Sequence, residues 1–170
     1  KAFETVQTLI RENLIIAGHD ISAGGMITSL LEMTFGRNDI GLNLDLDKLG
    51  EKDIIRLLFS EKPGVVIQVN DAGKVSSILE KQGMQFSVIG NIIPGRNIKI
   101  SHQNKEYTFD INSWRDTWFK TSYLLDRKQC GPKLAEVRYK NYKAQELSFR
   151  FPSTFTRKCE QYGIIPSRRA

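Results

Sequence analysis

The chain has 170 residues and a net charge of +6, which is enough for one domain with an extension and for a sizeable buried core. No apolar run approaches the roughly 20 residues of a membrane-spanning helix, and no signal-peptide pattern is present, so membrane insertion is excluded. Cys130 and Cys159 lie far apart without CxxC spacing or a nearby His, which excludes a disulfide framework or a cysteine metal site and favours a reducing, cytoplasmic setting.

Periodic apolar positions predict the elements of the first half. In chain order these are a helix over 3–13, a strand or helix end over 14–17, a helix over 26–36, a strand over 42–46, and a short helix over 54–58 that ends before the Pro63-Gly64 turn. Leu42, Leu44 and Leu46 alternate with polar residues, which is typical of a strand buried on one face. Because the chain begins at Lys1 with a helical pattern, we expect a piece of a longer protein.

The second half continues with a similar mixture. Residues 64–69 are continuously apolar and β-branched, which predicts a central strand covered on both faces. A helix over 72–82, strands near 86–93, 97–101 and 106–111, and a long helix capped by Asn112 or Ser113 follow. The predicted fold class is α+β, with helices packed on a mixed or antiparallel sheet.

After Gln129 the periodicity ends, and we divide the chain into a domain over 1–128 and a linker over 129–170. Residues 1–126 carry 14 Lys and Arg against 16 Asp and Glu, whereas residues 127–170 carry 11 against 3. The basic excess therefore lies in the linker, and no nucleic-acid motif accompanies it. We expect the linker to run extended over protein surfaces, held by the aromatic residues Phe149, Phe151, Phe155 and Tyr162, apart from a possible short helix over 133–142.

Residues His19 to Gly25 place an imidazole, a carboxylate, a hydroxyl and two glycines directly before a predicted helix. A helix N-terminus favours anions through its unpaired N–H groups and its dipole, and glycines let a ligand approach the backbone. Asp20 offers the hard oxygen that Mg²⁺ prefers, and Ser22 can either cap the helix or contact a phosphate. The same residues also fit an ordinary cap, a plain turn and a solvated acid, because the spacing matches no P-loop.

The remaining candidates give weaker signals. His102 lies in a predicted polar hairpin turn, where we expect exposure, and His19 beside Asp20 also fits a simple hydrogen-bonded pair. Glu61, at a helix-to-strand turn, is either a second metal ligand or, more simply, a solvated acid. Without a Walker A or GxGxxG sequence, a nucleotide would be held by backbone and metal from more than one domain. We assign no catalytic residue.

The run from His19 to Met26, the pair Glu32-Met33 and the stretch from Glu61 through Val69 together resemble the phosphoribosylformylglycinamidine synthase family. These are large, single-chain, glutamine-dependent enzymes of purine synthesis. The resemblance covers nearly the whole chain and is to the second AIR-synthase-related C-terminal domain and the linker that leads to the glutaminase domain. It implies a fold like the AIR synthase C-terminal domain.

The resemblance further implies that the full-length enzyme converts formylglycinamide ribonucleotide, glutamine and ATP into formylglycinamidine ribonucleotide, glutamate, ADP and phosphate. By position, Asp20 matches an aspartate that ligates Mg²⁺, and Ser22 matches a serine that contacts ATP. Ala23 stands where members often have a second Asp, so any role of that side chain is lost here. The turn at Glu61 varies on the family's acidic pair, so Glu61 receives no role.

The expected partners are the other domains of the same chain, including the glutaminase domain, and the small-molecule substrates; no nucleic acid or membrane is expected. The resemblance places the partner nucleotide-binding domains before this piece and the glutaminase cysteine after it, so neither Cys130 nor Cys159 is that nucleophile. We therefore expect the isolated piece to be inactive. The alternative is a structural or auxiliary module that holds a nucleotide without direct catalysis.

Overall fold

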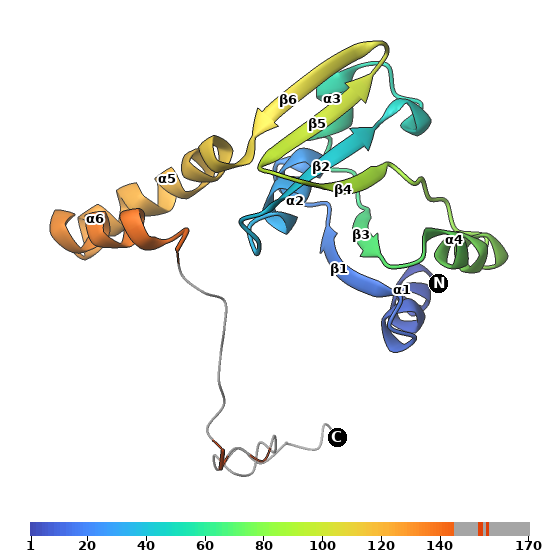
Figure 1. Ribbon diagram of the computed structural model, residues 1–170, viewed down its shortest axis with the longest axis horizontal. Helices are drawn as coiled ribbons and strands as arrows, with labels where there is room; N and C mark the ends of the chain where they lie inside the picture. Colours follow the sequence, from blue (N-terminus) through green and yellow to red (C-terminus); the bar gives the residue numbers. More distant parts are fainter. Residues whose placement is uncertain (145–152, 155, 157–170) are drawn as a thin grey trace.

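Helices packed around two β-sheets make up the part of the chain that the computed structural model describes, residues 1–144, 153–154 and 156 (Figure 1). The elements in order are α1 (Ala2–Arg11), β1 (Ile15–Asp20), α2 (Gly25–Met33), β2 (Ile40–Asp45), the 3-10 helix η1 (Asp47–Leu49), α3 (Ile54–Phe59), β3 (Val65–Val69), α4 (Ala72–Lys81), β4 (Gly90–Pro94), β5 (Asn97–His102), β6 (Lys105–Asp110), α5 (Ile111–Gln129) and α6 (Pro132–Asn141). The predicted linker aromatic residues Phe149, Phe151, Phe155 and Tyr162, and also Cys159, lie outside the described residues.

The larger sheet has four strands in the order β4-β2-β5-β6. Strands β2 and β5 are parallel, with Leu44 opposite Ile100, and the other pairs are antiparallel. The predicted α+β class with a mixed sheet is confirmed. Helices α2 and α3 cover one face of this sheet, and together they bury what we call the main core: Met26, Ile27, Leu30, Leu31, Leu44, Leu46, Leu58, Ile98, Ile100 and Ile111.

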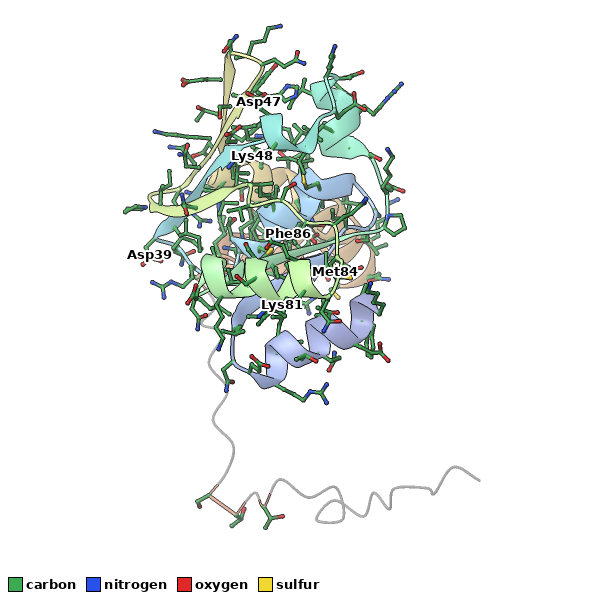
Figure 2. The ribbon with its side chains drawn as sticks, turned by 90° about the vertical axis from the view of Figure 1, so that its right-hand side faces the viewer. Asp39, Asp47, Lys48, Lys81, Met84 and Phe86 are labelled. Atoms are coloured by element: carbon green, nitrogen blue, oxygen red, sulfur yellow. The ribbon has the colours of Figure 1, made fainter. Side chains whose placement is uncertain are left out.

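The smaller sheet consists of β1 and β3, which pair antiparallel. It packs against α1 and α4, and what we call the second core is formed there by Leu9, Leu14 and Val75. Figure 2 shows α4, labelled at its last residue Lys81, lying next to α1. This second core is small: the apolar side chains packed around its three buried residues keep part of their surface exposed.

The prediction of a central, fully covered strand over 64–69 is wrong. Within the described residues β3 pairs only with β1, and Val65 is 55% exposed. The strand is continuously apolar for another reason. Val66 packs against the main core, whereas Ile67 and Val69 pack against the second core. The two faces of β3 thus contact different cores, and each contact is partial.

Smaller differences concern the element ends. The run over 14–17 belongs to a strand, β1, and the predicted strand over 86–93 begins only at Gly90. The cap of α5 is Asp110, not Asn112 or Ser113. The Asp110 carboxylate accepts a hydrogen bond from the backbone N–H of Ser113 at 2.7 Å, and this bond lowers the pKa of Asp110.

Helices α5 and α6 form a hairpin that extends away from the sheets (Figure 1). The rings of Phe119 and Tyr142 stack with centroids 4.1 Å apart, and the Tyr123 hydroxyl donates to Glu136 at 2.7 Å. The short helix predicted over 133–142 is therefore confirmed as α6. The domain boundary at residue 128 falls at the end of α5 and stays a prediction. None of the helices in the described part of the chain has the length and apolar character needed to cross a membrane.

Candidate functional site

The motif from His19 to Gly25 begins on a strand and ends on a helix. His19 and Asp20 are the last two residues of β1, and α2 begins at Gly25. Asp20 is opposite Val65 of β3, and the backbone N–H of Ile21 then donates to the carbonyl of Gly64 at 2.8 Å. The loop between strand and helix therefore leaves the small sheet from a hydrogen-bonded position.

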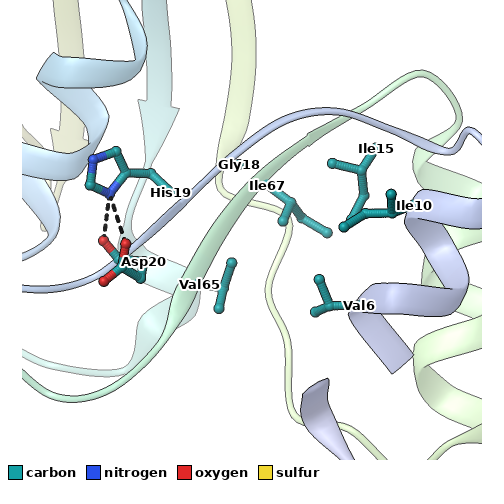
Figure 3. A pocket seen from close by; sticks show the side chains of 8 residues that line it. All are labelled: Val6, Ile10, Ile15, Gly18, His19, Asp20, Val65 and Ile67. Atoms are coloured by element: carbon teal, nitrogen blue, oxygen red, sulfur yellow. Dashed lines mark hydrogen bonds and ion pairs between the residues drawn. The ribbon is translucent and has the colours of Figure 1, made fainter. Parts of the chain in front are cut away.

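The backbone of Asp20 is fixed, whereas its side chain is free to meet a ligand. Its carbonyl oxygen accepts from the hydroxyl of Ser29 at 2.9 Å and contacts Nδ1 of His19 at 2.6 Å. The carboxylate is 77% exposed. Nδ1 of His19 lies 3.6 Å from its Oδ1 (Figure 3). An exposed carboxylate next to a fixed backbone is accessible to a cation.

His19 is held mainly by α2 rather than by the Asp20 side chain. Its Nε2 lies 2.9 Å from Oε2 of Glu32, and both side chains are about three-quarters shielded from solvent. The other oxygen of Glu32 accepts from the indole N–H of Trp118, on α5, at 2.7 Å. Glu32 carries only the resemblance in the sequence and Trp118 carries no signal there, because no local pattern places α5 beside this motif.

The loop itself is braced by contacts that differ from the predicted ones. Gly24, at φ +84°, is the N-cap of α2, and Ser22 is not. The N–H of Gly24 donates to Oε1 of Glu61 at 2.9 Å, and the N–H of Gly25 donates to the carbonyl of Ser22. Glu61 is exposed, as expected of a solvated turn acid, and its carboxylate additionally braces this loop through the bond to Gly24. Ser22 therefore does not cap the helix; its side chain is exposed, and its contact with a phosphate stays a prediction.

His102, the second histidine, is a structural residue. It follows Ile98 and Ile100 on the inward face of β5 and is only 3% exposed, so the predicted surface exposure is wrong. Its Nε2 lies 2.7 Å from the carbonyl of Glu51, in the loop after η1. The side chain is buried because the alternation of β5 continues to the last residue before the turn.

A hollow of about 320 Å³ opens beside the motif (Figure 3). His19 and Asp20 form its polar end, and the remainder is apolar, lined by Val6, Ile10, Ile15, Val65 and Ile67 of α1, β1 and β3. Within the described residues, no cluster of three or more His, Cys, Asp or Glu side chains is placed to hold a metal ion. The site therefore does not form a complete metal cage. It fits Mg²⁺ bound through one carboxylate, with phosphate and water as the other ligands, which is usual in nucleotide sites.

The chain is similar in sequence to a known protein family and to several known proteins. The family described as "AIR synthase related protein, C-terminal domain" matches residues 1–103. Over 96% of its length the chain is 34% identical to the probable chloroplastic/mitochondrial phosphoribosylformylglycinamidine synthase of Arabidopsis thaliana. It is 31% identical over 91% of its length to the human enzyme of that name. The chain spans about 12% of the length of each relative.

Solved structures share the fold. PurL of T. maritima complexed with ATP matches 64% of this chain, which corresponds to 20% of PurL, with a TM-score of 0.56 and 19% identity. The same protein complexed with FGAR matches with a TM-score of 0.57 and 18% identity, over 65% of this chain and 19% of PurL. At this identity the match concerns the fold alone.

Proposed function

We propose that this chain, which belongs to the family of the AIR synthase related protein C-terminal domain, is one part of a phosphoribosylformylglycinamidine synthase. In that enzyme, formylglycinamide ribonucleotide, glutamine and ATP would yield formylglycinamidine ribonucleotide, glutamate, ADP and phosphate. The relatives of that name match nearly the whole chain yet are much longer. The activity therefore requires further domains, and the 170 residues alone are expected to be inactive.

The proposed contribution of this part is a Mg²⁺-nucleotide contact. Asp20 would ligate Mg²⁺ and Ser22 would donate its hydroxyl to the nucleotide, since both side chains are exposed at the end of β1. When bound, Mg²⁺ neutralises phosphate charge. The protein itself supplies a fixed Asp20 backbone, clamped by Ser29, and a loop braced by Glu61. The combination of this fixed backbone with a free carboxylate is the observation that carries the proposal.

The N–H groups of Gly24 and Gly25 already have protein acceptors. They are therefore not expected to hold a phosphate, and the nucleotide must gain its other contacts elsewhere. The open, largely apolar hollow beside Asp20 also lacks further charged groups. Both features support a nucleotide site completed by neighbouring domains of the same full-length chain. The proposed enzyme would also include a glutaminase domain that delivers ammonia. Two cysteines without metal or redox spacing support a cytoplasmic setting for the enzyme.

The test is Asp20→Asn in the full-length enzyme. We expect the Mg²⁺ concentration that gives half-maximal nucleotide binding to rise at least about tenfold, because the amide removes the ligand charge. Asp39→Asn is the matched control, since Asp39 is an exposed carboxylate paired with Arg37 outside the motif. Unchanged Mg²⁺ dependence in Asp20→Asn would overturn the proposal.

Turnover of the same variant separates the two roles of the site. If turnover collapses in folded, nucleotide-loaded enzyme, the nucleotide held here takes part in catalysis. If turnover persists while bound nucleotide and thermal stability fall, the nucleotide is auxiliary and holds the domains together.

A further inference from the structure

A line of side chains leads from α5 to the carbonyl of Asp20. The indole N–H of Trp118 donates to Oε1 of Glu32 at 2.7 Å, and Oε2 of Glu32 lies 2.9 Å from Nε2 of His19. Nδ1 of His19 then lies 2.6 Å from the carbonyl oxygen of Asp20. Helix α5 begins at residue 111, after the family match over 1–103 ends, so the line joins the motif to a segment outside that match.

The contacts along this line converge on two acceptors. A carbonyl oxygen only accepts, so in the 2.6 Å contact Nδ1 of His19 donates to Asp20. The indole N–H of Trp118 donates to Oε1 of Glu32, and Oε2 of Glu32 lies 2.9 Å from Nε2 of His19, so the imidazole has a close partner at each nitrogen. The Asp20 carboxylate lies close by, with Oδ1 3.6 Å from Nδ1.

We propose that Trp118 and Glu32 are positioning residues that keep His19 hydrogen-bonded to the backbone carbonyl of Asp20, at 2.6 Å, rather than to its carboxylate, at 3.6 Å. This inference rests on the proposed function, in which that carboxylate ligates Mg²⁺. Freed from Glu32, the imidazole can turn by a small movement from the carbonyl to Oδ1 and occupy the oxygen that the cation needs. Helix α5 thereby sets the metal affinity of a site that it does not touch.

The structure supplies a matched pair of tryptophans on α5 for the test. Trp118→Phe removes the indole N–H and keeps an aromatic ring beside Phe35, whose ring is 5.1 Å from that of Trp118. Trp114→Phe removes an indole N–H from the same helix, where Trp114 packs edge-on against Phe109 at 5.5 Å. Glu32→Gln, a third variant, keeps the shape of the acceptor and removes its charge.

The experiment measures ATP and ADP binding to the full-length enzyme across a Mg²⁺ titration. For Trp118→Phe we expect the Mg²⁺ midpoint to rise about tenfold, with nucleotide affinity at saturating Mg²⁺ within about twofold of the unmodified enzyme. Glu32→Gln should raise the midpoint at least as much, and Trp114→Phe should leave it unchanged. A merely structural role would instead lower nucleotide affinity at every Mg²⁺ concentration, together with the unfolding temperature.

The outcomes separate the two proposals. If Asp20→Asn shifts the Mg²⁺ midpoint and both Trp118→Phe and Glu32→Gln leave it in place, the positioning role is wrong and the Mg²⁺ ligand stands. If Asp20→Asn also leaves the midpoint in place, the proposed ligand is wrong, and the positioning role falls with it. An equal shift in Trp114→Phe would show a general effect of α5 packing and would also overturn the positioning role.

Discussion

The main core and the second core differ in how completely their side chains are buried, and the motif lies between them. The main core holds large side chains with almost no exposure, such as Ile98 at 0% and Ile100 at 1%. The second core has Leu9 at 0%, but half-buried neighbours surround it, and Ile10 and Ile16 nearby are 48% and 59% exposed. Close packing resists local opening, whereas a small and partly wet cluster opens at lower free energy.

Strand β1, which carries the motif, and strand β3, which flanks it, connect the main core with the second core. Asp20 is the last residue of β1 in the small sheet. Its carbonyl accepts a hydrogen bond from Ser29 of α2, which is 2% exposed. The rigid side of the motif is thus the main core, and the hollow lies on the side of the second core. A binding residue at such a junction has a fixed backbone and an open approach for ligands or neighbouring domains.

The largest effect is expected in the main core. Ile98→Ala should lower the free energy of unfolding by about 4 kcal/mol, because this residue of β5 is fully buried in the main core and its truncation leaves a cavity. Urea denaturation followed by circular dichroism measures this change. Val65→Ala, at a strand position that is 55% exposed, is the control and should cost under about 1 kcal/mol. Equal losses in the two variants would contradict the difference in packing.

A second variant acts where the motif meets the main core. Gly25 has φ +74°, and a Cβ there would lie 2.6 Å from the carbonyl oxygen of Leu58 and 2.7 Å from Cα of Phe59. Gly25→Ala should therefore cost about 3 kcal/mol, from backbone strain and from displacement of α3. Gly50→Ala separates the two causes, since Gly50 has φ +72° with nothing within 4 Å of the added atom. It should cost only about 1 kcal/mol in the same denaturation assay.

These packing differences also explain what the sequence predicts well. The strand over 42–46 follows from the alternation of Leu42, Leu44 and Leu46, because burial on one face imposes a period of two. The same period, extended from Ile98 and Ile100, already indicates that His102 faces inward. The polar turn that follows favours exposure instead, and that prediction is wrong because His102 is still the last residue of β5. The failure at β3 differs in kind, since an apolar run does not distinguish one core on both sides from two partial cores.

The candidate site divides in the same way. His19, Asp20 and Ser22 lie within four residues of the sequence, so a local motif is enough to suggest them. Their supports are distant in sequence. Glu61 reaches the loop from beyond α3, and Trp118 reaches Glu32 from α5. Such contacts depend on how helices are placed on the sheet, and no periodicity in one segment encodes them.

A smaller and local effect is expected in the second core. Leu9→Ala should cost about 2 kcal/mol, at the low end for a buried leucine, because the half-buried side chains around it can close the space. Native-state hydrogen exchange should show faster exchange in α1 and α4 and unchanged exchange in β5. Faster exchange of β5 by the same factor would mean that the two cores unfold as one unit and that the contrast between them is not energetic.

The smallest effect concerns the far part of the α5–α6 hairpin, where polar contacts join the two helices beside the stacked rings. Asp116 accepts from the Tyr142 hydroxyl at 2.6 Å and from Lys143 at 2.7 Å. Partial burial tends to raise the pKa of Asp116, but these two hydrogen bonds together with the charges of Lys143 and Arg115 outweigh it, and the pKa is lowered overall. Burial and the bond to Asp116 together raise the pKa of Tyr142.

The sign of the pH dependence follows from these directions. A carboxyl with a lowered pKa stabilises the fold above its ordinary pKa, and this contribution is lost as the pH falls through the lowered value. Tyr142→Phe removes one of the bonds that lower the pKa of Asp116, so the acid loss should begin at higher pH. At pH 7 the variant should lose about 1 kcal/mol, measured by urea denaturation. Tyr139→Phe is the control, because Tyr139 stacks beside Tyr142 at 5.9 Å, and its acid profile should match that of the unmodified chain. If both variants shift the acid limb equally, the shift does not come from the hydrogen bond between Tyr142 and Asp116.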